Sequence, residues 1–140
     1  YRYSFWHLVE RETELNTRAE QVLHQIGLAA RRDIPAGVLA YAEQRALEIG
    51  ITIAAGANVI MLDEPTAGMS RAETEFAVAM VRRITEGRTL VMVEHDMSVV
   101  FDLADRISVL ANGRIIAIGK PEQIRRDPAV QEAYLGVVAT

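Results

Sequence analysis

Two adjacent carboxylates, Asp63 and Glu64, directly follow the apolar run Val59–Leu62 and precede Pro65. A short continuous apolar run is typical of a buried strand in a parallel sheet, and the proline ends it. Ligands of such sheets collect at the carboxyl ends of the strands. We therefore expect this pair to lie where a phosphate and its metal ion would bind. The plainer alternative is that both acids only cap the turn after the strand.

A histidine occupies a comparable position after a second apolar run. Thr89–Val93 leads into His95, which lies thirty-one residues beyond Glu64. Because the ends of parallel strands open on one edge of a sheet, His95 is expected to reach the same ligand as the acid pair. The alternative is an ordinary loop histidine held by local hydrogen bonds.

A third segment of interest is Leu39–Arg45, which leads into a helix about twenty residues before the acid pair. The unpaired N–H groups and the dipole of a helix N-terminus attract anions. Taken alone, the segment is better explained as the loop that leads into a helix.

The phosphate loop that such a site needs is missing from the sequence. The pattern G-x-x-x-x-G-K-[ST] occurs nowhere, and the one lysine, Lys120, follows Gly119 but precedes Pro121. In nucleotide hydrolases of the P-loop kind, that loop cradles the phosphates beside the metal-binding acid. The sequence therefore predicts one part of a nucleotide site.

The spacing of apolar residues and turn signals predicts the elements that position these groups. Strands are expected at 59–62 and 89–93, a hairpin at 107–111 and 114–118, and helices at 10–26, 42–55, 71–86, 97–104, 121–124 and 128–135. Ser70 and Glu73 form a capping box for the third helix. That helix is expected to face inward with Phe76, Met80, Val81 and Ile84. Alternation of strands and helices implies right-handed crossovers and a parallel sheet, that is, an α/β fold.

Composition narrows the possible functions. The 140 residues carry a net charge of −4, which disfavours a nucleic-acid surface, and contain no cysteine. Without cysteine there is no disulfide framework, and a cytoplasmic location is permitted. The stretch 49–62 is too short and interrupted to span a bilayer, and residues 1–10 lack a signal-peptide pattern. Because the first residue is Tyr1, not Met, we expect a processed chain or a piece of a longer one.

Together these segments resemble the ATP-binding subunits of ABC transporters over nearly the whole chain. Met61–Thr66 resembles the Walker B motif, and Leu39–Arg45 resembles the signature motif, LSGGQ or LSYGEQR in that family. Ala67–Ser70 falls at the D-loop, and His95 at the switch histidine. The segments 91–97, 104–107 and 133–136, with Pro121, look most like the branched-chain amino-acid importers, although lipopolysaccharide-export ATPases have a similar ending.

The resemblance implies a role for each candidate residue. Asp63 would hold Mg²⁺, Glu64 would act as general base on the attacking water, and His95 would contact the γ-phosphate. The signature loop would cover ATP held by a second ATP-binding subunit; it consists of Leu39, Ala40, Tyr41, Ala42, Glu43 and Gln44. Ser70 would belong to the D-loop. ATP and Mg²⁺ are the implied cofactors. Transmembrane permease subunits are the implied partners, on the cytoplasmic face of the inner membrane, with no nucleic acid.

The sequence departs from the family pattern at several points. Ala40 replaces Ser, Ala42 replaces Gly, and Ser70 stands where the D-loop has Asp or Asn. The larger departure is the missing first half. The resemblance therefore implies the second half of a P-loop NTPase core. Residues 1–55 would be the end of the helical subdomain with the signature loop, and 56–140 the C-terminal half of the ATPase core with its hairpin and short helices.

The preferred interpretation is a C-terminal fragment of an ATP-hydrolysing subunit for amino-acid import of the branched-chain type, inactive by itself for lack of a Walker A motif. An interaction module docking on a membrane subunit is the first alternative, favoured by Ala40 and Ala42 and disfavoured by the intact acids. An ABC-type ATPase acting on DNA is the second, and the acidic balance disfavours it. A half sheet with an open edge is also expected to self-associate.

Overall fold

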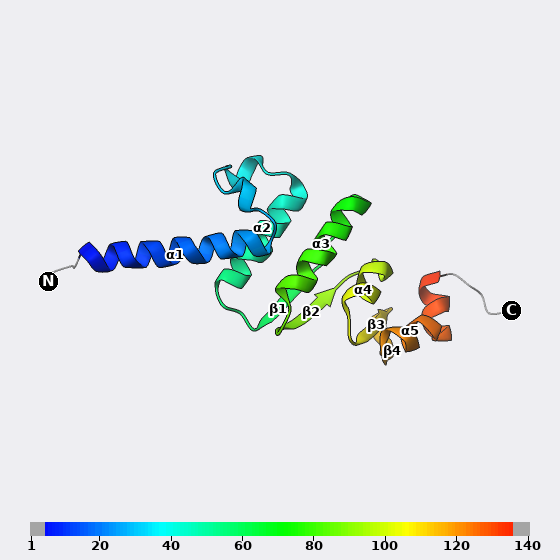
Figure 1. Cartoon of the computed structure of the whole chain (residues 1–140). Helices are drawn as coiled ribbons and strands as arrows, with labels where there is room; N and C mark the ends of the chain where they lie inside the picture. The colour runs from blue at the N-terminus through cyan, green and yellow to red at the C-terminus, as the bar shows by residue number, and fades with distance from the viewer. Residues whose placement is uncertain (1–4, 136–140) are drawn as a thin grey trace. The chain divides into compact units, whose positions relative to one another are not determined.

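The computed structural model describes residues 5–135, with side chains for residues 12–134. Contacts divide the chain into two compact units, Tyr1–Glu94 and His95–Thr140. Figure 1 shows the helices and strands of each unit in chain order. The boundary expected near residue 55 is a different one. It would separate the helical subdomain of an ABC cassette from the ATPase core, and it stays a prediction.

The first unit consists of helices that surround a short sheet. Its main elements are α1 (Phe5–Gln25), α2 (Tyr41–Ala54), β1 (Val59–Asp63), α3 (Arg71–Ile84) and β2 (Thr89–Val93), with 3-10 turns η1 (Ala29–Arg31) and η2 (Ala36–Val38). Apart from α1, which begins five residues earlier than predicted, these helices and strands lie within two residues of their expected bounds. Gly27 ends the α1 region with a φ of 77°, a backbone conformation that favours glycine.

The two strands of this unit pair in parallel, as predicted. The register runs from Val59 opposite Thr89 to Asp63 opposite Val93. The acid-bearing end of β1 therefore lies beside the carboxyl end of β2. Parallel pairing of strands joined by α3 is the βαβ arrangement that the alternating pattern implied.

Within the described residues of the first unit, the sheet is covered on one face only, which differs from the expectation of buried strands. Side chains alternate between the two faces of a strand. Ile60 is fully buried, whereas the opposite face exposes a row of apolar side chains: Val59, Met61, Val91 and Val93. An apolar run on both faces is typical of a strand with two covering layers. Among the described residues of this unit, the buried apolar side chains outside the sheet belong to α2, α3 and the connecting residues Ile26, Leu28 and Leu39.

The core of the first unit lies between its helices and the covered face of the sheet. Its buried apolar side chains include Ile26, Ala46, Ile49, Ile53, Ile60, Ala77, Met80, Val81 and Ile84. Helices α1 and α2 approach closely at Gly50, where an added Cβ would lie 2.8 Å from Cδ1 of Ile26.

The inward position predicted for Phe76 is wrong, because its side chain is 45% exposed. The ring lies against Gly27 instead, so close that a Cβ at Gly27 would be 2.9 Å from the Phe76 Cζ atom. The glycine that ends α1 thus leaves room for the aromatic ring at the surface, away from the core.

The second unit is a hairpin with short helices. It contains α4 (Met97–Leu103), β3 (Ile107–Ala111), β4 (Arg114–Gly119), α5 (Pro121–Arg126), α6 (Pro128–Val130) and the π-helical turn η3 (Gln131–Leu135). The predicted Asn112-Gly113 turn has φ values of 50° and 74°, as a two-residue hairpin turn requires. The single helix expected at 128–135 is divided into α6 and η3. The core comprises Ile107, Val109, Ile124 and Val130.

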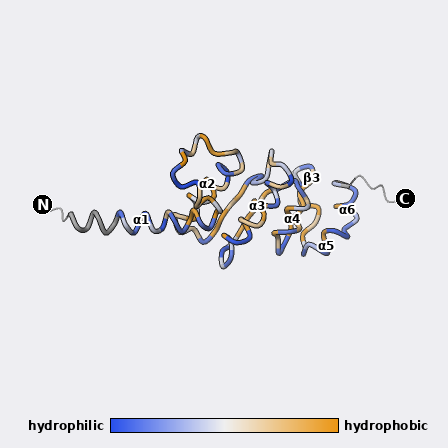
Figure 2. Tube along the Cα trace, turned by 45° about the horizontal axis from the view of Figure 1, so that its top comes forward, coloured by the Kyte–Doolittle hydropathy of each residue, from blue (hydrophilic) through white to orange (hydrophobic). Residues whose placement is uncertain are grey.

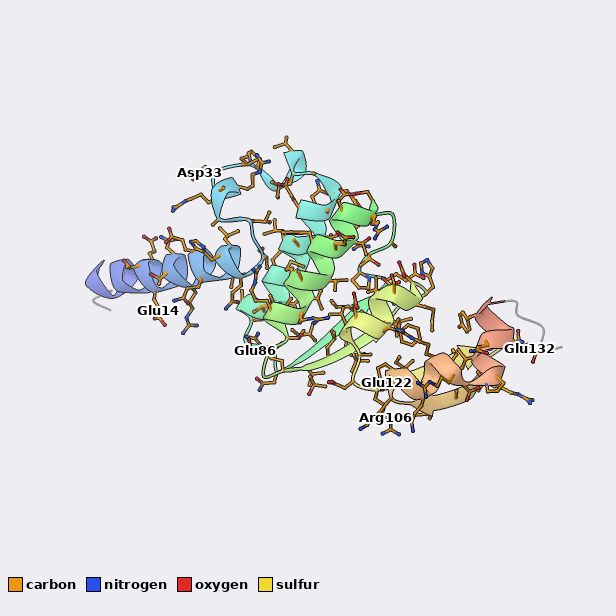
Figure 3. All side chains as sticks on the ribbon, turned by 45° about the vertical axis from the view of Figure 1, so that its right-hand side comes forward. Glu14, Asp33, Glu86, Arg106, Glu122 and Glu132 are labelled. Carbon is orange, nitrogen blue, oxygen red and sulfur yellow. The ribbon has the colours of Figure 1, made fainter. Side chains whose placement is uncertain are left out.

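The surfaces of both units are polar where helices face solvent. Hydrophilic residues recur along α1 in Figure 2. Figure 3 shows the side chains of both units, and six exposed charged residues are labelled there: Glu14, Asp33, Glu86, Arg106, Glu122 and Glu132. Within the described part of the chain, every helix is too short or too polar to cross a membrane.

Candidate functional site

The acid pair sits at the carboxyl end of β1 with an unusual backbone. Asp63 is the last residue of the strand, and both carboxylates are exposed. Glu64 has a φ of 42°, in the left-handed region that residues other than glycine rarely adopt. Its N–H donates to the carbonyl oxygen of Val93 at 2.9 Å, extending the parallel ladder past the end of the strand. A strained residue held in place this way is typical of functional sites.

The turn after the acid pair is anchored to the end of β2. Thr66 is buried, and its backbone N–H donates to Oε1 of Glu94 at 3.2 Å. The Thr66 hydroxyl donates to the same carboxylate oxygen. The N–H of Ala67 donates to the carbonyl oxygen of Glu64 at 3.1 Å, which closes a tight turn. These contacts fix the direction in which the chain leaves the strand.

Ser70, the predicted D-loop residue, caps helix α3. Its N–H and its hydroxyl both contact Oε2 of Glu73, at 2.8 and 2.6 Å. The hydrogen bond from the Ser70 hydroxyl holds the pKa of the Glu73 carboxyl below its ordinary value. The capping box predicted from the sequence is therefore confirmed, and the hydroxyl is engaged within its own helix.

The predicted signature loop forms the start of α2. Leu39 is buried, Ala40 is the N-cap residue, and the helix begins at Tyr41. Glu43 accepts the N–H of Ala40 at 3.0 Å, but the alanine has no oxygen with which to complete the capping box. The Gln44 side chain donates to the carbonyl oxygen of Leu39 at 3.1 Å. Glu43 and Gln44 thus stabilise the loop that contains them.

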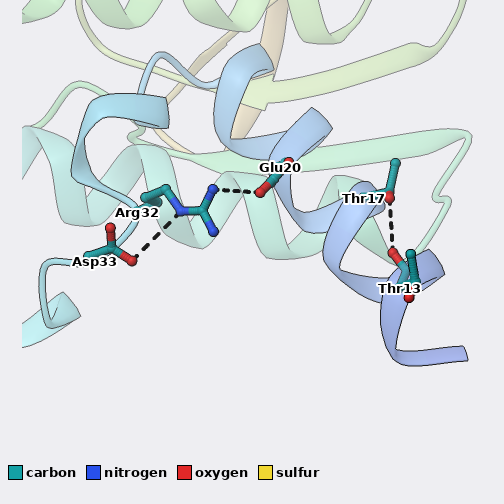
Figure 4. Close-up of polar contacts among 5 residues, drawn as sticks. All are labelled: Thr13, Thr17, Glu20, Arg32 and Asp33. Atoms are coloured by element: carbon teal, nitrogen blue, oxygen red, sulfur yellow. Dashed lines mark hydrogen bonds and ion pairs between the residues drawn. The ribbon is translucent and has the colours of Figure 1, made fainter. Parts of the chain in front are cut away.

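Arginines from η1 and the loop that follows it tie this segment to the neighbouring helices. Arg31 Nε contacts Oε1 of Glu43 at 3.0 Å, on the α2 side. Arg32 Nη1 contacts Oε1 of Glu20 at 2.6 Å, on the α1 side, and its Nε lies 3.7 Å from Asp33 (Figure 4). The sequence showed these arginines only as a polar loop. Their pairing depends on how the chain turns between the helices.

The structure brings the predicted signature loop and the predicted D-loop together within the first unit. A Cβ added to Gly68 would lie 3.8 Å from Cε1 of the Tyr41 ring. The Arg45 guanidinium stands over that ring, 5.7 Å from its centroid. Two segments predicted to contact ATP are thereby neighbours, although they lie far apart in sequence.

His95 follows β2 by two residues and is the first residue of the second unit. Its side chain is exposed. The next residue, Asp96, caps α4 by accepting the N–H of Ser98 at 2.8 Å. The hydrogen bond from the Ser98 hydroxyl lowers the pKa of Asp96. Because His95 and the acid pair belong to different units, their convergence stays a prediction.

The residues at the carboxyl end of β1 fit a magnesium site in which the phosphates of a bound nucleotide supply part of the coordination. Among the side chains described, no group of three or more His, Cys, Asp or Glu is arranged to hold a metal. Mg²⁺ in phosphate-transfer sites takes only one or two protein carboxylates, and substrate phosphates and water supply the other ligands. An exposed Asp63 at the strand end meets that limited requirement.

Glu94 is the member of this site to which the sequence assigned no role. It lies directly before His95, and Thr66 lies directly after the acid pair and its proline. The sequence does show that both residues lie just beyond a strand. Because neighbouring parallel strands end at the same edge of a sheet, this was the available signal that they could be close. The bond itself requires the register that the structure supplies.

Comparison with known proteins links this arrangement to one family. The family model described as "Branched-chain amino acid ATP-binding cassette transporter" matches residues 114–140. LivG of Escherichia coli K12, a high-affinity branched-chain amino acid transport ATP-binding protein, is 39% identical over 127 residues, covering 89% of this chain and 50% of LivG. BraF of Pseudomonas aeruginosa is 38% identical, with the same coverage.

Solved structures agree with the sequence relatives. The ADP conformation of MJ1267, an ATP-binding cassette of an ABC transporter, superposes with a TM-score of 0.77 at 29% identity, covering 88% of this chain and 50% of that one. The fold is thus that of part of a P-loop NTPase core of the ABC type. The chain spans about half the length of the curated relatives it matches. These relationships identify the chain as a relative of the ATP-binding subunits of ABC transporters, and the branched-chain amino-acid group is the one it resembles.

Proposed function

We propose that this chain is the C-terminal half of an ATP-hydrolysing subunit that drives import of branched-chain amino acids. Its partners are transmembrane permease subunits and a second ATP-binding subunit. It works peripherally at the cytoplasmic face of the inner membrane. The likeness to LivG and BraF supports the transporter class, and the names of these two relatives suggest the cargo.

One observation carries the proposal. An Asp-Glu pair ends a parallel strand, and Glu64 is held there in a left-handed conformation by a bond to the neighbouring strand. A strained conformation of this kind persists only where surrounding contacts impose it. It gives the Glu64 side chain a direction that an extended backbone would not give it.

The chemistry proposed for each residue is the one that the family resemblance implies. Glu64 accepts a proton from the water that attacks the γ-phosphorus, a role typically worth about a hundred- to ten-thousand-fold in rate. Asp63 holds Mg²⁺, which neutralises charge on the phosphates when bound. His95 contacts the γ-phosphate and that water. The signature loop, with Ser70 in the D-loop, covers ATP held by the second subunit.

The missing phosphate loop must come from another segment, so the chain alone hydrolyses no ATP. The test is to mix the chain with a polypeptide that contains the N-terminal half of LivG and to measure phosphate release with MgATP. We expect turnover that falls about a hundredfold or more in Glu64→Gln. Glu86→Gln, an exposed glutamate just beyond α3, is the matched control and should retain the rate. Turnover in the mixture that is equal in the Glu64→Gln variant contradicts the proposal.

A non-catalytic interaction module is the second candidate. Ala40 supports it, because the N-cap of α2 lacks the hydroxyl with which the family would contact phosphate. The uncovered apolar face of the β1–β2 sheet is also suited to contact with another protein. Binding to a membrane permease without nucleotide-dependent turnover in the reconstituted mixture would favour this candidate.

A further inference from the structure

Glu94 makes an unusual pair of contacts with a residue twenty-eight positions away in sequence. Its Oε1 atom accepts both the backbone N–H and the hydroxyl of Thr66. Thr66 is 8% exposed, and it is the buried polar residue of the described core. Hydrogen bonds to a carboxylate are stronger than neutral ones, and a buried donor that loses its acceptor is costly. The pair is therefore a substantial link between the ends of β1 and β2.

The link acts on the segment that contains the acid pair. On one side of Glu64, the parallel ladder ends with the 2.9 Å bond from its own N–H to Val93. On the other side, two residues later, Thr66 is fixed by Glu94. Glu64 lies between these two anchors, with a φ of 42°. Contacts on both sides of Glu64 are needed to maintain its left-handed φ. Without them the backbone would relax to an ordinary φ, which would redirect the side chain.

The same link reaches the loop that follows. The N–H of Met69 donates to the carbonyl oxygen of Thr66 at 3.2 Å, and Ser70 then caps α3. Gly68, between them, lies against the Tyr41 ring. Thr66 is consequently the fixed point from which the chain passes to the D-loop and its contact with the signature loop.

We propose that Glu94 is a positioning residue, whose carboxylate holds Thr66 and thereby fixes the backbone of Glu64 and the start of the D-loop. The consequence for ATP hydrolysis rests on the proposed function, whereas the link itself does not. Glu94 acts through the loop and needs no contact with nucleotide. The Oε1 atom accepts both hydrogen bonds from Thr66, so the side-chain oxygen of a glutamine at this position can accept them in its place.

The test is amide hydrogen exchange in the purified chain, without nucleotide. In Glu94→Ala, the amides of Glu64, Thr66 and Ala67 should exchange roughly ten- to a hundredfold faster, the loss expected for hydrogen bonds to a charged acceptor. Glu94→Gln should restore most of the protection. The amide of Thr85, bonded to Val81 at the end of α3, should keep its rate and reports on any effect that extends beyond the loop. Glu86→Ala is the matched control for loss of a carboxylate.

Several results would overturn the proposal. Unchanged exchange at the three loop amides in Glu94→Ala is one, and equal acceleration at Thr85 is another. Equal loss of amide protection in Glu94→Gln is a third, because it would indicate that the charge of Glu94, not its capacity to accept hydrogen bonds, holds Thr66. Should Glu94→Ala fail to fold, Thr66→Val supplies the answer, since it removes only the hydroxyl bond and should accelerate exchange locally. No result of this assay depends on ATP, so it can fail while the turnover assay succeeds, and the reverse.

Discussion

The start of α2 offers a sharp test, because α3 contains the completed form of the same motif. Ala40 has φ −62° and ψ 156°, and Ser70 has φ −67° and ψ 163°. In α3 the Ser70 hydroxyl and Glu73 satisfy each other's backbone N–H groups. In α2, Glu43 accepts the N–H of Ala40, but Ala40 has no side-chain oxygen to accept the N–H of Glu43. Ala40→Ser should therefore complete a capping box without moving the backbone.

Replacing alanine by serine at an N-cap stabilises a helix by about 1 kcal/mol. For a chain of this size, that gain should raise the midpoint of thermal unfolding by about 3–4 °C. Urea denaturation followed by circular dichroism gives the free energy, and an unchanged slope would indicate an unchanged unfolded state. Ala40 is exposed, so a hydroxyl there is not buried without a partner.

A pair of isosteric variants separates capping from size. Ala40→Thr should gain most of the serine effect, whereas Ala40→Val has the same shape but no oxygen and should gain nothing. Equal stability of the alanine and serine proteins, or of the threonine and valine proteins, would refute the assigned role of position 40. Ser70→Ala is the reverse experiment and should lose a similar amount.

Three further predictions concern packing, titration and association. Gly50→Ala should lower the free energy of unfolding by about 1–3 kcal/mol in urea titrations, despite the better helix propensity of alanine, because its Cβ would lie 2.8 Å from the buried Ile26 side chain; no loss would show that the helices can separate. Ser98→Ala should raise the pKa of Asp96 measured by NMR. Because the folded pKa is depressed, this cap stabilises the chain above the ordinary aspartate pKa of about 3.9 and the effect is lost as the pH falls through the folded value; an unaltered titration counts against it. The uncovered apolar sheet face should cause self-association, and Met61→Lys, at a side chain 75% exposed, should weaken it; a concentration-independent monomer in sedimentation of the unmodified chain would contradict this.

Local patterns predicted the strands and most helices closely. The apolar run before Asp63, the Asn112-Gly113 turn and the Ser70 cap each depend on residues near in sequence, so periodicity and turn chemistry were sufficient. The α/β class followed from the order of the elements. The candidate acids were recognisable because their position after a strand is itself a local feature.

The differences arose where tertiary contacts decide. Phe76 has the sequence spacing of a core residue, but its ring lies at the surface, against Gly27, where there is no Cβ. Met61 and its neighbours belong to an apolar strand, yet no described residue covers their face. The Thr66–Glu94 link depends on strand register over twenty-eight residues. Such contacts cannot be deduced from spacing alone.

The central claim is that Glu64 belongs to a nucleotide site completed by another polypeptide segment. The most direct measurement is steady-state phosphate release from MgATP by the purified chain, compared with its Glu64→Gln variant. We predict no difference for the chain alone, and Glu64-dependent turnover once the half of LivG that this chain does not match is added. Sustained hydrolysis by the isolated chain that disappears in Glu64→Gln would contradict the account.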